Sequence, residues 1–153
     1  MNAISLYQFS HWLHVRKVPV LPKTVQYLIF LLYNSFIPPS AVIGAGSLFA
    51  YGGMGVVLHV HTRIGRGCLI GQGVTIGARE AFVAKEANKA PVIGDNCYIA
   101  AGAKILGDIR IGNNCIIGAN AVVLENIPDN SVVVGMPGKP IKTVPDGYRA
   151  IRI

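Results

Sequence analysis

An aliphatic or aromatic residue recurs every six positions between residues 37 and 123, with two interruptions. A second small or apolar residue usually stands four places after it. An α-helix would need apolar residues at three- and four-residue steps, and an ordinary strand would need longer alternation. Two inward positions in every six residues predict a coil with three flat faces, which buries its core by stacking on the next coil. The repeated residues are Ile37, Ile43, Phe49, Leu58, Ile64, Ile70, Ile76, Ile93, Ile99, Ile105, Ile111, Ile117 and Val123.

This repeat predicts an all-β solenoid of about five coils with a short α-helical segment before it. We expect the helical segment over residues 1–36, the solenoid over 37–135 and a C-terminal tail over 136–153. Within the first segment, apolar periodicity and prolines predict an amphipathic helix over 3–17 and a second helix over 23–34. Its expected role is to cap the first coil or to form contacts in a trimer, and docking on a membrane surface is the alternative.

The three cysteines, Cys68, Cys97 and Cys115, all fall on the second inward position of the repeat, so core packing explains them. An odd number of widely spaced cysteines predicts neither a disulfide framework nor a CxxC metal site, and it favours a reducing, cytoplasmic location. The longest apolar stretch, near residues 25–37, is shorter than a membrane-spanning helix requires. We therefore expect a cytoplasmic protein, with peripheral contact at the inner face of the membrane as a further option.

The charge is unevenly distributed, because all seven acidic residues lie between Glu80 and Asp146. Residues 1–79 therefore have a formal charge of +6 and no carboxylate side chain. Such a field attracts a phosphate-bearing cosubstrate, an anionic membrane surface or a nucleic acid. Nucleic acid is disfavoured because the basic residues are dispersed and no recognition motif accompanies them.

The two interruptions of the repeat are the expected places for a functional site. Three extra residues enter around Tyr51 to Gly55, and a polar segment over 77–91 is expected to loop out from one corner. Loops that extend from a rigid scaffold commonly build binding sites.

Several motifs resemble those of the hexapeptide-repeat acyltransferases, and in particular the serine acetyltransferases and their relatives in polysaccharide biosynthesis. The resemblance covers nearly the whole chain and rests on the segments 10–13, 37–41, 74–77, 101–107, 117–123 and 134–139. It implies a left-handed parallel β-helix, a homotrimer and an acetyl-CoA molecule that lies between neighbouring solenoids. It also implies transfer of an acetyl group to a hydroxyl.

By this resemblance, the pantetheine arm of acetyl-CoA would pass small residues on the solenoid and its nucleotide end would lie near the basic C-terminal segment. Tyr51, Gly52 and Gly53 would contact the acceptor. Taken singly, each glycine or alanine is equally well explained by the needs of the coil. The residues implied for acetyl-CoA are Gly77, Ala78, Ala101, Ala119, Gly135, Lys139 and Lys142.

Acetyl transfer to a hydroxyl needs a general base, for which histidine is best suited near neutral pH. His59 is the first candidate, because it replaces the usual small residue after an inward position, and His61 is the alternative. His11 and His14 belong to the first predicted helix and are expected at a surface or interface. An orienting carboxylate would have to come from Glu80, Glu86, Asp95 or Asp108, or a backbone carbonyl would serve instead.

The chain departs from the serine acetyltransferases where that family has its two active-site histidines and its aspartate, which correspond to Gly52, Ala90 and Phe36. The segment from Tyr51 to His59 instead resembles the motif of the polysaccharide-cluster relatives. We therefore expect an O-acetyltransferase that acts on a sugar or polysaccharide precursor. A serine or other small-metabolite acetyltransferase is the first alternative, and a non-catalytic CoA-binding or assembly subunit is the second.

A zinc enzyme on the same solenoid is disfavoured. A catalytic zinc site needs three protein ligands, and the repeat region offers only two histidines, His59 and His61. We expect no metal.

Overall fold

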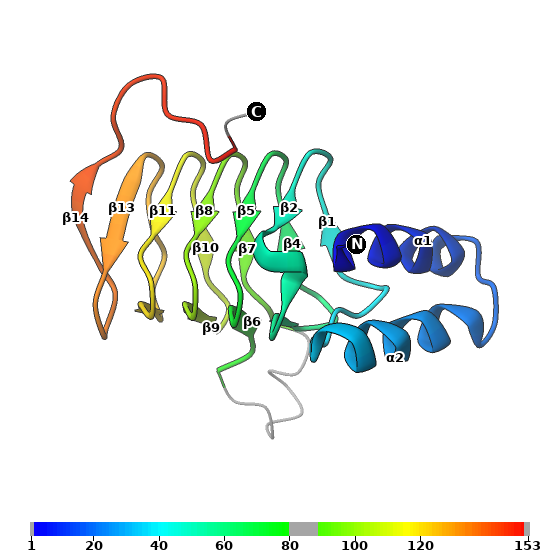
Figure 1. Cartoon of the computed structure of the whole chain (residues 1–153). Helices are drawn as coiled ribbons and strands as arrows, with labels where there is room; N and C mark the ends of the chain where they lie inside the picture. Colours follow the sequence, from blue (N-terminus) through cyan, green and yellow to red (C-terminus); the bar gives the residue numbers. More distant parts are fainter. Residues whose placement is uncertain (1, 80–88, 152–153) are drawn as a thin grey trace.

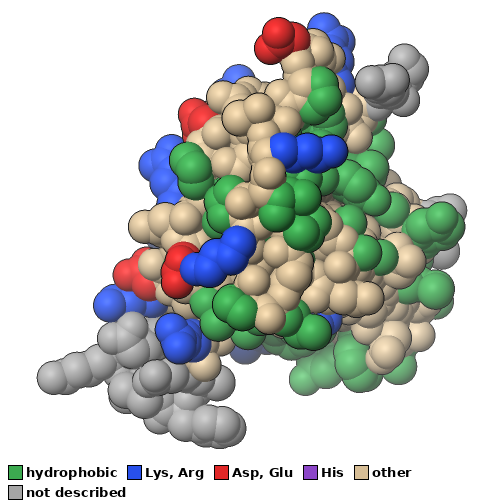
Figure 2. Space-filling view, turned by 90° about the vertical axis from the view of Figure 1, so that its left-hand side faces the viewer, with side chains coloured by type: hydrophobic (Ala, Val, Ile, Leu, Met, Phe, Trp, Pro, Cys, Tyr) green, Lys and Arg blue, Asp and Glu red, His purple; other side chains and the backbone are tan. Residues whose placement is uncertain are grey.

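The computed structural model describes residues 2–79 and 89–151, which form a three-sided solenoid capped by two helices (Figure 1). Seen from its C-terminal end, the molecule has a roughly triangular outline (Figure 2). Each side is a sheet of short parallel strands, one from each coil. The side that we call the β3–β12 sheet contains β3 (Val57–Leu58), β6 (Thr75–Gly77), β9 (Lys104–Leu106) and β12 (Val122–Val123).

The other two sides are the β1–β10 sheet and the β2–β14 sheet. The β1–β10 sheet contains β1 (Val42–Ile43), β4 (Arg63–Ile64), β7 (Val92–Ile93) and β10 (Arg110–Ile111). The β2–β14 sheet contains β2 (Leu48–Phe49), β5 (Leu69–Ile70), β8 (Tyr98–Ile99), β11 (Ile116–Ile117), β13 (Ser131–Val134) and β14 (Lys139–Thr143). Only β14 runs antiparallel to its neighbour.

The inward residues of the repeat form the core, as the period predicts. Twelve of the thirteen repeated aliphatic or aromatic residues are buried, and the exception, Ile43 in the first coil, is half-buried beside the helices. The second inward positions are buried as well, apart from the half-buried Ile109. Cys68, Cys97 and Cys115 are buried and free, so their prediction as core residues is confirmed.

Three corners join the sheets, and we name them by their characteristic residues. The histidine corner (described residues 59–62, 78–79, 89–91, 107–109 and 124–126) connects the β3–β12 sheet to the β1–β10 sheet. The asparagine corner (44–47, 65–68, 94–97, 112–115 and 128–131) leads from there to the β2–β14 sheet. The glycine corner (50–56, 71–74, 100–103 and 118–121) returns the chain to the β3–β12 sheet.

At the asparagine corner, successive coils approach so closely that side chains are excluded. A Cβ atom on Gly44 would lie 2.5 Å from the carbonyl carbon of Gly65, and one on Gly94 would lie 2.7 Å from that of Gly112. Asn96, Asn114 and Asn130 have positive φ angles. Their side-chain amides stack, with Asn96 donating to Asn114 over 2.9 Å and Asn114 to Asn130 over 3.0 Å.

The helices α1 (Ala3–Val15) and α2 (Leu21–Tyr33) cover the open end of the first coil. The Asn2 side chain caps α1 by accepting from the amide of Ile4. The helix ends at Val15 rather than at residue 17, because Lys17 takes a positive φ of 58°. The hydroxyl of Tyr7 donates to the carbonyl of Ala41 over 2.7 Å, and burial raises the Tyr7 pKa to about 12. Neither described helix is long and apolar enough to cross a membrane.

The C-terminal segment differs from a simple tail. After a turn, β14 pairs with β13 and adds an antiparallel strand to the last coil. The chain then returns across the asparagine corner (Figure 1). There the Asn96 side chain donates to the carbonyl of Tyr148 over 3.1 Å and accepts from the amide of Ala150 over 2.8 Å.

Replacement of Asn96 tests how much this contact stabilises the fold. Asn96→Ala removes three hydrogen bonds and places alanine at a positive φ. We expect the free energy of unfolding to fall by roughly 2–4 kcal/mol. Asn96→Gly should cost about 1 kcal/mol less, because glycine tolerates this backbone conformation. Denaturant unfolding of both variants measures the difference, and equal losses would contradict the backbone part of the explanation.

Candidate active site

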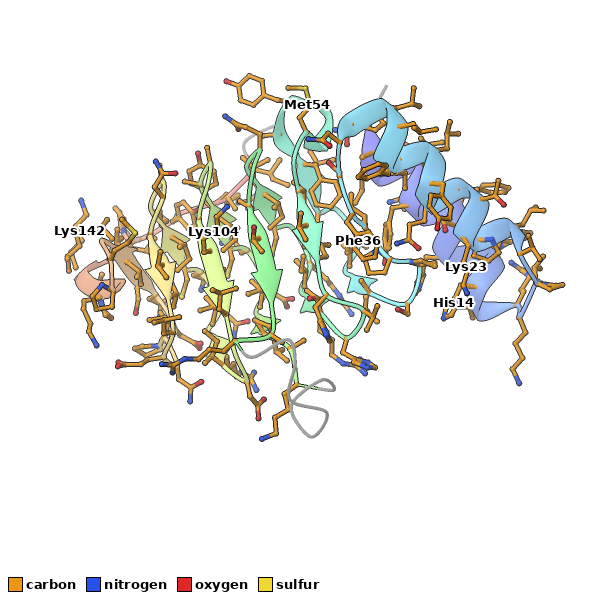
Figure 3. All side chains as sticks on the ribbon, turned by 90° about the horizontal axis from the view of Figure 1, so that it is seen from below. His14, Lys23, Phe36, Met54, Lys104 and Lys142 are labelled. Carbon is orange, nitrogen blue, oxygen red and sulfur yellow. The ribbon has the colours of Figure 1, made fainter. Side chains whose placement is uncertain are left out.

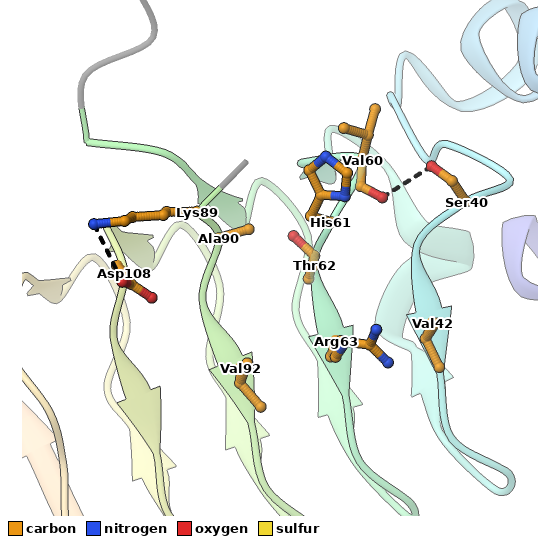
Figure 4. A pocket seen from close by; sticks show the side chains of 10 residues that line it. All are labelled: Ser40, Val42, Val60, His61, Thr62, Arg63, Lys89, Ala90, Val92 and Asp108. Carbon is orange, nitrogen blue, oxygen red and sulfur yellow. Dashed lines mark hydrogen bonds and ion pairs between the residues drawn. The ribbon is translucent and has the colours of Figure 1, made fainter. Parts of the chain in front are cut away.

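A polar pocket of about 340 Å³ opens beside the histidine corner, on the side of the β1–β10 sheet (Figure 4). It spans four successive coils, from Ser40 before β1 to Asp108 before β10. His61, Arg63, Lys89 and Asp108 supply its titratable side chains. The full lining is Ser40, Val42, Val60, His61, Thr62, Arg63, Lys89, Ala90, Val92 and Asp108.

His59 and His61 are adjacent but have different surroundings. The ring centroids are 5.5 Å apart, and the backbone amide of His61 donates to Nδ1 of His59 over 3.2 Å. A neutral imidazole has one donor and one acceptor nitrogen. Because Nδ1 of His59 is the acceptor here, its proton belongs on Nε2, which is therefore not available as a base in this arrangement.

The environment of His59 favours its neutral form. Partial burial lowers its pKa below the ordinary histidine value, and the neighbouring His61 lowers it further. His61 is exposed and lines the pocket, whereas His59 is half-buried and does not. His61 is therefore the histidine whose ring borders the pocket, and His59 accepts the backbone amide of His61.

Of the four carboxylates predicted as candidates to orient a catalytic histidine, the structure describes Asp95 and Asp108. Asp108 lies in the pocket, 3.7 Å from the ammonium group of Lys89. Asp95 lies at the asparagine corner, where it accepts from the amide of Arg66 over 2.7 Å. It is therefore at a different corner of the solenoid from His59 and His61. Glu80 and Glu86 lie outside the described residues. Within residues 2–79 and 89–151, no carboxylate contacts the ring of His59 or His61.

The residues predicted to contact acetyl-CoA border the outer face of the β3–β12 sheet, but on opposite edges. Gly77 ends β6 and Ala78 follows it at the histidine corner. Ala101 and Ala119 lie at the glycine corner, and Gly135 follows β13 on that side. One copy of the chain therefore presents two separate groups of small residues with a sheet face between them.

The predicted basic residues at the nucleotide end lie on the C-terminal strand. Lys139 forms an ion pair of 2.7 Å with Glu125, and Lys142 is exposed on β14. Lys139 is therefore partly neutralised, while Lys142 is open to solvent.

Lys104 is a charged residue on the same sheet face that the sequence analysis did not single out. It is outward on β9, and its ammonium group donates to the carbonyl of Gly73 at the glycine corner over 2.6 Å. Along this side of the molecule it lies between Lys142 and Phe36 (Figure 3). Its position within the motif over 101–107, at an outward place of the repeat, is the signal that could have identified it.

The three inserted residues at the glycine corner form a tight turn in η1 (Ala50–Gly53). Tyr51 has a φ of 51° and is 78% exposed, so its side chain is free to contact a ligand or another copy of the chain. Gly53 is buried, and a Cβ atom there would lie 3.1 Å from that of Ala3. The carbonyl of Gly53 accepts from the buried hydroxyl of Ser35 over 2.5 Å.

Ala90, Phe36 and Gly52, the three positions at which the sequence departs from the serine acetyltransferase pattern, lie at three different places. Ala90 is buried in the wall of the pocket. Phe36 lies at the edge of the β3–β12 sheet, where it pairs with Val57, and Gly52 lies in the inserted turn. Among the described residues, no group of three or more histidine, cysteine or acidic side chains could hold a metal ion.

The chain has clear relatives among known proteins. Residues 90–125 match the family described as bacterial transferase hexapeptide (six repeats). The serine acetyltransferase of Synechococcus elongatus is 41% identical over 141 residues, which are 92% of this chain and 56% of that protein. The serine acetyltransferase of Staphylococcus aureus (strain Mu50) is 41% identical over 150 residues, which are 97% of this chain and 67% of that protein.

Solved structures agree with this similarity. The serine acetyltransferase of Brucella abortus strain S19 in complex with coenzyme A has a TM-score of 0.86 at 29% identity, covering 94% of this chain and 56% of that one. A serine acetyltransferase in complex with cysteine has a TM-score of 0.85 at 31% identity, covering 96% and 55%. The prediction of a left-handed parallel β-helix with short N-terminal helices is confirmed. The chain spans between about half and two thirds of the length of the relatives it matches.

The lowered pKa of His59 predicts how the free energy of unfolding depends on pH. Because the folded state lowers this pKa, the unfolded chain takes up a proton first as the pH falls below about 6.5. The free energy of unfolding should therefore decrease on the acid side of that value, and His59→Asn should reduce the decrease. Denaturant unfolding on both sides of about pH 6.5 measures it. An identical pH dependence in wild type and variant would contradict the assignment.

Proposed function

Because the chain belongs to the hexapeptide-repeat transferase family that includes the serine acetyltransferases, we propose that it transfers an acetyl group from acetyl-CoA to a hydroxyl group of a small acceptor. The single observation that carries this proposal is the similarity to a serine acetyltransferase across 97% of the chain. The polar pocket at the histidine corner is the proposed place of the reaction.

In the proposed reaction, the acceptor hydroxyl oxygen attacks the thioester carbonyl carbon of acetyl-CoA. A new C–O bond forms, the C–S bond breaks and the hydroxyl proton passes to the ring of His61. The protonated imidazole then returns that proton to the departing CoA sulfur. His59 is a positioning residue, since its Nδ1 holds the backbone amide of His61.

Acetyl-CoA is proposed to lie against the β3–β12 sheet, past Gly77 and Ala78 or past Ala101 and Ala119. Small side chains allow close approach of the pantetheine arm. The two groups of residues lie at different corners of one chain, so a groove between copies would bring the histidine corner of one copy to the glycine corner of the next. This arrangement favours a homotrimer, because three flat sides suit threefold symmetry. The nucleotide phosphates would be near Gly135, Lys139 and Lys142.

L-serine is the first acceptor to test, in view of the relatives. Arg63 places positive charge in the pocket, where a carboxylate could bind. The second candidate is an acetyltransferase for a sugar or polysaccharide precursor. It is favoured by the absence of the family's histidines and aspartate at Gly52, Ala90 and Phe36, and by the motif from Tyr51 to His59. A non-catalytic CoA-binding subunit is the outcome if no acceptor reacts.

A reducing, cytoplasmic location completes the proposal. The three cysteines are free and buried in the core, which is compatible with such a setting. Contact with the inner face of a membrane would suit a lipid-linked acceptor.

The role of His61 can be tested by release of free CoA from acetyl-CoA with L-serine, nucleotide sugars and oligosaccharides as acceptors. His61→Ala should lower kcat by roughly 10²–10⁴-fold, the usual contribution of a general base. His59→Asn keeps an oxygen that can accept the His61 amide, and it should retain most of the activity. If His59→Asn is inactive and His61→Ala is active, then His59 is the base and our assignment is wrong.

The role of Arg63 can be tested by comparing charged and neutral acceptors. Arg63→Gln removes a charge-assisted hydrogen bond, so KM for a carboxylate-bearing acceptor should rise by roughly 10- to 100-fold. KM for a neutral saccharide should stay nearly constant. Arg110→Gln, two strands away on the same sheet, is the matched control. Equal effects of both substitutions would argue against a specific contact at Arg63.

A further inference from the structure

In the part of the chain that the structure describes, the helical hairpin exposes many large apolar side chains. The connection between α1 and α2 lies at the opposite end of the molecule from β14 (Figure 1). Val15, Val20 and Leu31 are 65%, 74% and 77% exposed. We call the exposed apolar residues of the two helices and their connection the hairpin surface: Phe9, Trp12, Val15, Val20, Leu21, Tyr27, Leu28, Phe30, Leu31 and Leu32.

Basic side chains accompany this apolar surface at the tip of the hairpin. Arg16 and Lys17 follow α1 directly, and Lys23 lies in the first turn of α2. The guanidinium group of Arg16 lies 3.8 Å from the ring centroid of Trp12, so a cation is held on one of the exposed aromatic rings. No carboxylate side chain occurs before Glu80, so the hairpin has no acidic side chain of its own.

We propose that the hairpin surface docks the protein on an anionic lipid bilayer, with its apolar side chains in the interface and Arg16, Lys17 and Lys23 at the level of the lipid headgroups. Apolar side chains flanked by lysine and arginine on a short helix are the features that produce binding in the plane of a membrane. Negatively charged headgroups attract juxtaposed basic side chains. This inference concerns binding alone and does not require the proposed acetyl transfer.

A second copy of the same hairpin is a poorer partner on electrostatic grounds. Two hairpins that met through this surface would bring Arg16, Lys17 and Lys23 of both copies together. Residues 1–79 supply no carboxylate side chain to pair with them. Like charges at a contact are unfavourable, whereas a bilayer that contains anionic lipid supplies the missing negative charge.

The hairpin can lie on a bilayer but not span it. Each helix has 13 residues, and at a rise of about 1.5 Å per residue it is roughly 20 Å long. The hydrocarbon core of a bilayer is about 30 Å thick.

The test is co-sedimentation of the full chain with phosphatidylcholine vesicles that either contain or lack phosphatidylserine. Binding is expected only with phosphatidylserine, and it should weaken at high salt. Removing all three hairpin charges (Arg16→Gln, Lys17→Gln, Lys23→Gln) should lower the partition coefficient on the order of a hundredfold, at about fivefold for each charge. The matched control is Arg66→Gln, Arg110→Gln, Arg149→Gln, which changes the net charge equally at exposed positions elsewhere and should change binding far less.

An apolar variant separates the hydrophobic contribution from the charge. Val15→Gln, Val20→Gly and Leu31→Gln alter exposed side chains, and glycine accommodates the positive φ of 66° at Val20, so folding should persist. This variant should also lose vesicle binding, with an unchanged circular dichroism spectrum. Equal binding by wild type, hairpin variants and control would overturn the proposal. The proposal would also be overturned if the wild type did not bind vesicles and the apolar variant had a smaller sedimentation coefficient than the wild type. The hairpin surface would then be a contact between protein copies.

Discussion

The stacking of one coil on the next through main-chain hydrogen bonds governs this structure. The amide of Gly44 donates to the carbonyl of Ile64, that of Gly65 to Ile93 and that of Gly94 to Ile111, each over 2.8–2.9 Å. Such a ladder continues only if every coil has the same shape at the same place. The close approach at the asparagine corner therefore excludes side chains, and the inward positions accept only side chains that fit the column above and below them. Extra residues can enter only at a corner, where they leave the ladder intact.

This constraint explains where chemistry can occur on such a scaffold. The three additional residues near Tyr51 enter at the glycine corner, and the segment after Ala78 enters at the histidine corner. The sheets between them hold these irregular places at a fixed separation and orientation. The polar pocket combines residues from four successive coils, since Ser40, His61, Ala90 and Asp108 are distant in sequence but stack at one corner. The rigidity of the coil thus supplies the positioning that a reaction needs, while the corners supply the functional groups.

Much of the fold could be predicted because the six-residue period specifies the inward residues directly. The period ends before residue 136, so it gave no indication that β14 reverses and pairs with β13. The candidate site was less predictable. The spacing placed His59 and His61 outside the core, but the acceptor role of Nδ1 in His59 depends on where the amide of His61 points. Likewise, the assignment of Asp95 and Asp108 to different corners requires the pairing of β7 with β4, on either side of residues 80–88, which a residue count does not provide.

The two ends of the solenoid are closed by different means. A stack of parallel coils would otherwise present a strand edge at each end, and unpaired edges recruit other chains. At one end α1 covers the first coil. At the other end, β14 pairs with β13 in the antiparallel direction and occupies its free edge. At this end the β2–β14 sheet therefore offers no parallel strand edge for a further coil to extend, although every coil is built from a unit that could in principle be repeated indefinitely.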